Sequence, residues 1–339
     1  MPRPPVRLAD VAAVAGVSVP TASKVLNGGG RVSPATRDRI LQAAARLDFQ
    51  PDALAQFFAT GRSRTVGVLT QNAPATFTMP VLVGAMTTLG AHSLATLVLD
   101  GVGPDNVRTL QARRIDGLLV VGDGFGAPIH SVTAQFDVPV VYAFGISDRA
   151  DDVSFVPDSV GAGRSGAEHL LDIGRRRIAH VTASRDLAAD ERMAGLEATL
   201  TEAGLQLVTP PLRGEWTRAW GVVAARRLLA GGVEFDAVFC GNDQIAQGVF
   251  TVLRDAGLRV PEDVALIGMD NGPGVRDEGD HLLSTIDPNL GELGAAAARH
   301  LIAPEAAGQG PGVVRQPCTL IVGASTVATG VPTTGVLAG

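Results

Sequence analysis

Polar side chains follow several strand-like runs of this chain, at positions where parallel sheets bind ligands. Asp158, Asn242 and Asp270 come directly after such runs. Arg192 begins a helix that follows the run Ile178–Thr182. Because open parallel sheets bind ligands outside the carboxyl ends of their strands, we expect these side chains to line one cleft. Carboxylates accept hydrogen bonds from hydroxyl groups and a guanidinium supplies a rigid fork of donors, so this set predicts reversible binding of a small polar molecule.

Four more residues are candidates for the same cleft. Three of them follow the first strand-like run and one lies in the loop Gly214-Glu-Trp; they are Gln71, Asn72, Phe77 and Trp216. An indole in such a site stacks on the apolar face of a ring. Structural roles are alternatives for two of these residues. Asp158 also suits a helix cap, as does Asp243 next to Asn242, and Trp216 suits a half-buried core position.

A glycine motif offers a different chemistry. Gly161–Gly166 fits the dinucleotide pattern G-x-G-x-x-G, and Asp186 lies 20 residues beyond it. A hydride-transfer enzyme is therefore an alternative hypothesis. The preceding run Val153–Pro157 is short and ends in proline, and lone glycine motifs often mislead. The sequence has no evident Ser–His–Asp order, paired-carboxylate motif or metal cluster, so we expect neither catalysis nor a cofactor.

The first 27 residues contain the pattern of two short helices joined by a tight turn. Leu8, Val11, Ala12 and Ala15 share one helical face, Gly16 can end that helix and Ser18 can cap a second one with apolar positions Ala22, Val25 and Leu26. Val17 is expected to fill the corner between them. The pattern predicts a helix-turn-helix, although a generic helical corner shares it.

Charge supports the DNA-binding interpretation of this head. Residues 1–65 contain nine Lys or Arg and four Asp or Glu, a net charge of +5, whereas the remaining residues carry a net charge of −11. A basic head on an acidic body is expected when only the head meets a polyanion.

The residues after the helix-turn-helix predict a third helix and a linker. Ser33 and Pro34 begin a helix whose apolar stripe is Ile40, Leu41, Ala44 and Leu47. Residues 52–60 form a short helical candidate, and residues 61–64 are linker-like.

Strand-like and helical segments alternate from Thr65 onward. The expected strands are Val66–Leu69, Thr96–Leu99, Gly117–Val121, Val138–Phe144, Ile178–Thr182, Ala237–Cys240 and Ala265–Met269. The expected helices are Met79–Ala91, Val160–Ile173, Arg192–Ala203, Arg218–Leu229, Asp243–Ala256 and Leu290–Leu301. Such alternation predicts parallel sheets covered on both faces, and about 260 residues of it favour two lobes with a cleft.

The predicted organisation is an all-α helix-turn-helix domain followed by an α/β two-lobed domain that resembles periplasmic binding proteins. We expect the DNA-binding domain at residues 1–50, a hinge helix and linker at 51–64, the receptor at 65–330 and a flexible tail at 331–339. The first lobe takes about 65–158 and 288–316, and the second about 159–287 and 317–330. Cys240 and Cys318 lie in apolar runs without metal-type spacing, so we expect reduced core cysteines. No signal-like segment and no run of about 18 apolar residues occurs, which predicts a cytoplasmic protein and argues against a sugar-binding transport component.

The head, linker and body together resemble the lac repressor family of bacterial transcription regulators. In the head the resemblance rests on Leu8–Ala12, Ala15–Ser18, Thr21, Ser23–Asn27, Val32–Ser33, Thr36–Arg37 and Gln50–Pro51. In the body it rests on Asp158, Gly161, Ala167–Leu170, Gly174–Ala179, Arg192, Gly195, Asn242–Asp243, Gly248, Pro261–Val264, Gly268–Asp270 and Ser284–Ile286.

The resemblance implies how the head meets DNA. The second helix lies in the major groove, where Val19, Pro20 and Lys24 meet base edges. Lys24 could instead contact a phosphate. Phosphate contacts are implied for Ser18, Thr21, Ser23, Asn27 and Thr36. Residues 52–60 form a hinge helix in the minor groove, with contacts from Ala55 and with Phe58 in place of the family's leucine wedge. The alternative is that Phe57 and Phe58 pack onto the body.

The resemblance also implies the ligand and the assembly. The cleft binds a small effector, often a sugar or a nucleobase, and the protein acts as a homodimer on a palindromic operator, most commonly as a repressor. The helix Met79–Ala91 is the candidate for the dimer contact. The tail lacks a leucine heptad, so we expect no helix that would join two dimers into a tetramer.

Overall fold

Three helices form their own core at the N-terminal end of the computed structural model, which describes residues 6–26, 29, 31–49, 61–124, 127–277, 280–304 and 310–327. The helices are α1 (Leu8–Ala15), α2 (Val19–Leu26) and α3 (Pro34–Arg46). Gly16 ends α1 with a φ of 64°, which glycine adopts without steric cost. Ser33 caps α3 by accepting a hydrogen bond from the backbone N–H of Thr36. The predicted helix-turn-helix and third helix are confirmed.

One predicted core position of the head is wrong. Leu41 is 46% exposed, whereas Ile40, Ala43 and Ala44 are buried. A helix buries positions spaced by three and four residues, so the stripe that starts at Ile40 leaves Leu41 one step around the helix. Among the described residues, no single helix is long and apolar enough to span a membrane; α1 and α2 pass that composition test only as a pair bent by 104°. Their apolar faces pack into the three-helix core.

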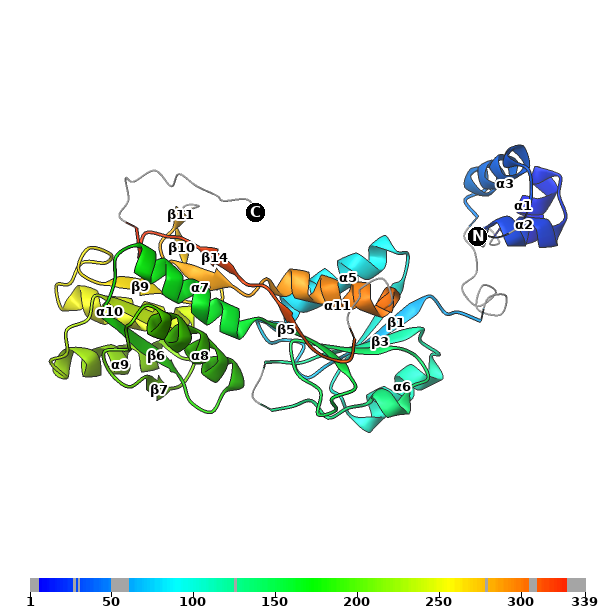
Figure 1. Cartoon of the computed structure of the whole chain (residues 1–339). Coiled ribbons are helices and arrows are strands. Elements are labelled where there is room, and N and C mark those ends of the chain that lie inside the picture. Colours follow the sequence, from blue (N-terminus) through cyan, green and yellow to red (C-terminus); the bar gives the residue numbers. More distant parts are fainter. Residues whose placement is uncertain are drawn as a thin grey trace, which may run out of the picture.

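The first lobe is built on a six-stranded parallel sheet with the order β13–β5–β4–β3–β1–β2 (Figure 1). Its strands are β1 (Thr65–Thr70), β2 (Ala95–Asp100), β3 (Gly117–Val121), β4 (Val140–Ala143), β5 (Val153–Pro157) and β13 (Gly312–Gln316). Helices α5 (Thr78–Ala91) and α11 (Leu290–Ile302) cover one face. The other face packs against α6 (Pro104–Ala112) and the 3₁₀ helix Thr133–Gln135 lies at its edge.

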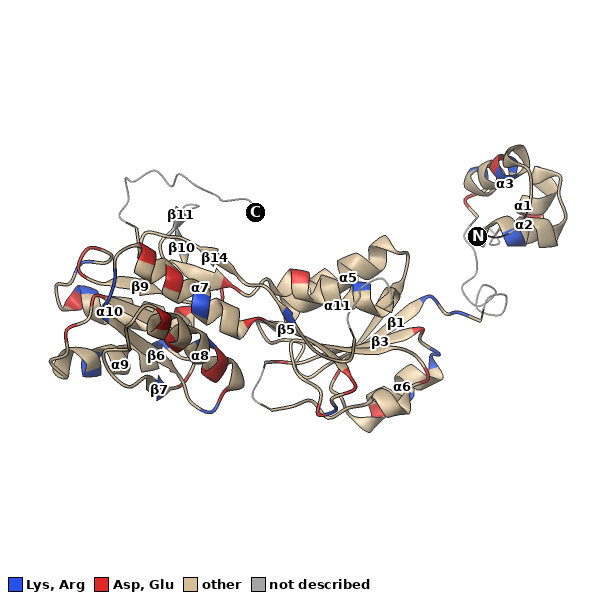
Figure 2. Ribbon diagram, viewed as in Figure 1, with Lys and Arg blue, Asp and Glu red and all other residues tan. Residues whose placement is uncertain are grey.

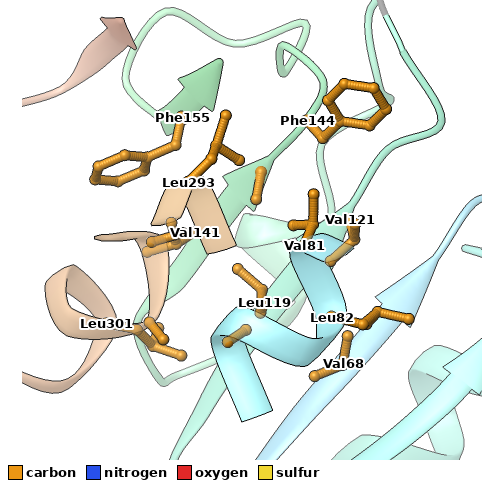
Figure 3. Close-up of a cluster of buried hydrophobic side chains, with 14 of the residues drawn as sticks. Val68, Val81, Leu82, Leu119, Val121, Val141, Phe144, Phe155, Leu293 and Leu301 are labelled. Atoms are coloured by element: carbon orange, nitrogen blue, oxygen red, sulfur yellow. The ribbon is translucent and has the colours of Figure 1, made fainter. Parts of the chain in front are cut away.

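The core under α5 and α11 is a cluster of buried apolar side chains. Figure 3 shows Val81 and Leu82 of α5 and Leu293 of α11 pointing toward Leu119 and Val121 of β3. Leu119, Val81 and Leu293 are fully buried. These strands are apolar on both faces, as expected for a parallel sheet covered by helices on both sides.

The second lobe is built on a four-stranded parallel sheet with the order β7–β6–β8–β9. Its strands are β6 (Ile178–Ala183), β7 (Leu212–Gly214), β8 (Ala237–Cys240) and β9 (Ala265–Ile267). Helices α7 (Ser159–Asp172) and α8 (Leu187–Glu202) cover one face, and α9 (Arg218–Ala230) and α10 (Asp243–Asp255) cover the other. Two small antiparallel pairs complete the lobe, β10 (Arg276–Asp277) with β11 (Asp280–His281) and β12 (Thr285–Asp287) with β14 (Thr319–Ile321).

The chain crosses between the lobes three times. The crossings lie between β5 and α7, between β12 and α11, and between β13 and β14. Figure 1 shows the last of these segments running alongside the others where the lobes meet. Three adjacent crossings form a narrow connection, so the two sheets can change their relative angle while each keeps its own core.

Glycines bring the helix pairs of both lobes into close contact. A Cβ at Gly163 of α7 would lie 2.0 Å from the carbonyl oxygen of Arg192 in α8, and a Cβ at Gly195 would lie 2.0 Å from that of Val160. The first lobe uses the same arrangement, since a Cβ at Gly294 of α11 would lie 2.0 Å from the carbonyl oxygen of Val81. The dinucleotide-like motif Gly161–Gly166 therefore falls inside α7, where Gly163 packs against α8 and Gly166 against Phe239, and it does not form a phosphate-binding turn.

Candidate functional site

A cavity of about 350 Å³ lies between the two lobes. The first lobe contributes Phe77, Asp123, Gly124, Phe144 and Leu290 to its wall. The second lobe contributes Asp186, Ala188, Arg192, Trp216, Asn242, Gln244, Met269 and Asp270. Pro157, Ser159 and Pro288 close the cavity at the crossing segments.

Arg192 is the cation of the cavity wall. It lies in the second turn of α8, because that helix begins at Leu187 and not at Arg192 as predicted. Its side chain is buried, its Nη1 donates to the carbonyl oxygen of Gly241, and its Cζ lies 5.2 Å from the centre of the Trp216 ring. The Nε has no hydrogen-bond partner among the described residues. Stacking and the carbonyl contact hold the guanidinium in place, and among the described residues they use one of its five N–H donors.

Asp186 and Trp216 are held together at the start of α8. One carboxylate oxygen of Asp186 caps the helix by accepting from the backbone N–H of Ala189 at 3.0 Å. The other accepts from the indole Nε1 of Trp216 at 3.2 Å. Trp216 also packs against the core of the second lobe, so the half-buried core position and the cavity position are both observed.

Asp270 and Phe144 face the cavity from opposite lobes with strained backbones. The φ angles are 110° for Asp270 and 54° for Phe144, in a region that residues with a Cβ rarely adopt. Such strain costs about 1–3 kcal/mol and persists where the surrounding structure imposes it. Burial raises the pKa of the Asp270 carboxyl to about 8, and the nearby Arg192 guanidinium partly opposes this rise.

Asn242, and not Asp243, caps α10. The Oδ1 of Asn242 accepts from the backbone N–H of Ile245 at 2.8 Å. Asp243 stands at the first helical position, where its carboxylate accepts from the Thr285 hydroxyl at 2.7 Å and from the backbone N–H of Gly272 at 2.9 Å. Burial raises its pKa to about 6. The prediction of Asp243 as a cap is wrong because adjacent Asn and Asp residues are equally suited to the position.

The structure brings five of the eight predicted ligand residues to the cavity wall, namely Phe77, Arg192, Trp216, Asn242 and Asp270. The other three lie outside the lining. Asp158 caps α7 by accepting from the backbone N–H of Gly161 at 3.0 Å. Gln71 accepts from the backbone N–H of Asp123 at 3.3 Å, and Asn72 is exposed in the turn after β1.

Sequence reasoning missed several residues of the wall. Asp123 follows β3 and Asp186 follows β6, so the rule that selected Asp270 after β9 would have found both. In the sequence, Asp186 also fits the position of the acidic partner of the glycine motif. Ser159, Gln244 and Met269 carry no such signal, because they lie within or beside helices and strands whose contacts decide their exposure.

The head presents a mixed polar and apolar surface along α2. Val19, Pro20 and Lys24 are exposed on it, while Ser23 is half-buried. The hydroxyl of Ser18 lies 2.8 Å from that of Thr21 and accepts from the backbone N–H of Thr21 at 3.4 Å. The hydroxyl of Thr36 lies 2.9 Å from that of Ser33. Asn27, Ala55, Phe57 and Phe58 lie outside the described residues.

Comparison with known proteins connects the head and the two lobes. Residues 7–52 match the family described as bacterial regulatory proteins, lacI family, and residues 167–326 match a periplasmic binding protein-like domain. The transcriptional regulator CelR of Thermobifida fusca is 32% identical over 307 residues, which cover 86% of this chain and 89% of that protein. The chain belongs to the lacI family. The sucrose operon repressor of Shigella flexneri is also 32% identical, over 94% of this chain and 99% of that protein.

Solved structures of lacI-family regulators share the fold. The lac repressor dimer bound to operator and the anti-inducer ONPF superposes with a TM-score of 0.69 at 26% identity, covering 96% of this chain and all of that one. The CelR–cellobiose complex superposes with a TM-score of 0.59 at 27% identity, covering 94% of this chain and 99% of that one. These relatives are transcriptional regulators, which favours the regulator over the dinucleotide-enzyme and transport alternatives.

Proposed function

We propose that this lacI-family protein is a repressor that binds operator DNA through α2 and changes its operator affinity when a small hydroxyl-rich effector fills the cavity between the lobes. The observation that carries the proposal is a polar cavity between two lobes in a chain that also has a helix-turn-helix. We assign DNA binding to residues 1–50, the linker to 51–64 and effector binding to the two lobes, with no catalytic role.

The charges of the cavity wall favour a neutral effector. Among the described lining residues, Asp123 and Asp186 provide two carboxylates against the guanidinium of Arg192, and Asp270 adds a third carboxyl group that keeps its proton at neutral pH because burial raises its pKa to about 8. Carboxylates accept hydrogen bonds from hydroxyls and repel anions, while the rings of Phe77 and Trp216 can cover the apolar faces of a sugar. The buried hydroxyl of Ser159 has no partner among the described residues and adds a further polar group. The cellobiose bound by CelR supports a sugar as the effector class.

On DNA, we propose that Val19, Pro20 and Lys24 contact base edges in the major groove. Lys24 can donate to guanine, whereas Val19 and Pro20 offer apolar contact to a thymine methyl. Phosphate contacts are proposed for the flanking polar residues Ser18, Thr21, Ser23, Asn27 and Thr36, with Ala55 and Phe58 in the minor groove. The hydroxyls of Ser18 and Thr21 already share a hydrogen bond, which fixes their direction at the start of α2.

The operator-bound lac repressor is a dimer, and we propose the same assembly for this chain. Helix α5 buries one face under the first lobe and leaves Met79, Val83 and Met86 exposed by 50%, 55% and 45%. Residues spaced by four and three positions share one face of a helix, so these three side chains form one apolar strip. A monomer rarely exposes such a strip, and a second copy can cover it.

The proposal is tested by a thermal-shift screen that includes cellobiose, sucrose and purine bases, followed by gel-shift titration of operators selected from random duplexes. A true effector raises the apparent melting temperature by mass action and changes operator affinity in the second assay. The sign of that change distinguishes induction from corepression. A protein that selects no duplex over random DNA, with or without these compounds, refutes the proposal.

Base reading by Lys24 is checked by Lys24→Ala. Loss of a good base contact costs about 1–3 kcal/mol at one operator position and relaxes the preference there. Uniform weakening on every duplex, with a shallower salt dependence, would assign Lys24 to a phosphate instead. Binding selections on wild-type and variant protein give both results.

A further inference from the structure

An ion pair joins the two lobes beside the crossing segments. Arg315 lies on β13 of the first lobe, and Glu191 lies on α8 of the second, 124 residues earlier in the chain. The Nη1 and Nη2 of Arg315 donate to the two carboxylate oxygens of Glu191 at 2.8 and 2.6 Å. A guanidinium that meets both oxygens in parallel forms the strongest and most directional kind of ion pair.

The pair is more buried than other ion pairs of the described residues. The side chain of Glu191 is 18% exposed and that of Arg315 is 39% exposed. The bidentate pair Arg259–Asp263, by comparison, lies within the second lobe with Arg259 69% and Asp263 34% exposed. Because both side chains are partly shielded from water, salt and solvent screen this pair less than a fully exposed one.

The same helix carries the ion pair and the cavity wall. Glu191 stands between Asp190, which binds Arg213 of β7 at 2.7 Å, and Arg192, which faces the cavity. Asp186 caps this helix and holds Trp216. Figure 2 shows that acidic residues are frequent on α7 and α8. The first two turns of α8 are therefore fixed to the second lobe on one side and to the first lobe through Glu191.

We propose that Arg315 and Glu191 form a latch that holds the two lobes in the relative placement described here. Arg315 is paired in register with Val156, beside the first crossing, so a small rotation about the crossings moves its guanidinium relative to α8. A change of lobe angle that separates β13 from α8 breaks the latch. The latch thereby opposes any such change and ties the position of Arg192 to the lobe angle. This inference goes beyond the proposed function and needs neither operator nor effector for its test.

The test measures the distance between the lobes in the full-length protein. Nitroxide labels are placed with Thr109→Cys on α6 and Arg226→Cys on α9, both exposed, in a Cys318→Ser background that leaves the buried Cys240 unlabelled. Labelled chains are diluted with unlabelled protein, so that double electron–electron resonance reports on single chains. With the latch intact we expect one narrow distance distribution. In Glu191→Gln we expect its mean to shift and its width to increase.

Two further variants separate the latch from a general effect of charge loss. Asp263→Asn removes a bidentate carboxylate within one lobe and should reproduce the wild-type distribution. The charge exchange Glu191→Arg with Arg315→Glu should restore the narrow distribution. If circular dichroism shows that Glu191→Gln does not fold, Arg315→Gln on the more exposed partner takes its place. A wild-type distribution in Glu191→Gln or in that substitute overturns the proposal, whether or not the protein binds DNA.

Discussion

The two lobes line one cavity with different chemistry. The first lobe presents Phe77, Phe144 and Leu290, with Asp123 as its carboxylate, whereas the second presents the polar groups of Asp186, Arg192, Asn242 and Asp270 beside Trp216. On the second lobe, hydrogen bonds to the backbone or to a neighbouring side chain fix Asp186, Arg192, Asn242 and Trp216. The difference suggests a division of labour, in which the second lobe orients the effector and the first lobe covers its apolar surface.

The largest effect is expected for Arg192→Ala. The change removes a buried cation that contacts Gly241 and stacks on Trp216, and hydrogen bonds to charged groups contribute about 1.5–3 kcal/mol each. Effector affinity should fall by about 100-fold, measured by calorimetry with the compound found in the thermal screen. Operator binding without effector should persist. Unchanged effector affinity would show that Arg192 does not contact the effector, and would contradict the proposal that the second lobe orients it.

Glycine substitutions compare the lobes directly. Gly163→Ala and Gly294→Ala each place a Cβ about 2.0 Å from a backbone carbonyl oxygen, so both should destabilise the protein by about 1–3 kcal/mol in urea unfolding. The carbonyl met by Gly163 belongs to Arg192, so this variant should also weaken effector binding, whereas Gly294→Ala should not. Gly90→Ala in α5 meets nothing within 4 Å and should be neutral or stabilising. Equal effects of the two variants on effector affinity would contradict a special role for α8.

The sequence predicts the features set by neighbouring residues better than those set by contacts between distant parts of the chain. Helices and strands with a clear period were predicted, since their faces are set by local spacing. The sequence did not predict the helix α6 or the strands β12 and β14. A helix of 9 residues and strands of 3 residues are too short to show a clear hydrophobic period. The start of α8 was placed too late, since the cap Asp186 was considered only with the glycine motif.

The sequence predicts those site residues that lie at strand ends, but not those whose position depends on how separate elements pack. Arg192, Asn242 and Asp270 follow from the rule that ligands gather at the carboxyl ends of parallel strands, which depends on topology alone. Asp158 satisfies the same rule but turns its carboxylate to the N-terminus of α7. Neither this choice nor the pairing of Glu191 with Arg315 across 124 residues can be read from spacing, because both depend on how separate elements pack.

A smaller effect is expected for Phe77→Ala on the first lobe. The ring lies 6.4 Å from that of Phe144, centre to centre, and lines the cavity at the start of α5. If this wall only covers the effector, loss of the ring should weaken binding by about 10-fold. That change corresponds to about 1.4 kcal/mol, the order expected when part of one apolar surface is no longer buried. Stopped-flow kinetics should place most of that loss in dissociation. A loss as large as that of Arg192→Ala would mean that both lobes orient the ligand.

The mildest test uses the pH dependence of stability. The folded pKa of Asp270 is raised to about 8 from an ordinary value of 3.8, so the folded protein holds a proton that the unfolded chain has lost between these values. Stability contributed by Asp270 is thus full below pH 3.8 and is lost as the pH rises toward 8. Urea unfolding of the wild type should show a fall of at least about 1 kcal/mol between pH 5 and pH 8 that Asp270→Asn reduces. Asp243, whose pKa is raised to about 6, acts in the same direction and remains in both proteins.

The control is Asp263, whose pKa is lowered to about 2. Its contribution to stability is lost only as the pH falls toward that value, so Asp263→Asn should shift the whole stability curve from pH 5 to pH 8 by a constant amount. An Asp270→Asn curve parallel to the wild type would mean that the carboxyl is already ionised in the free protein and that the second lobe meets its effector with a full negative charge.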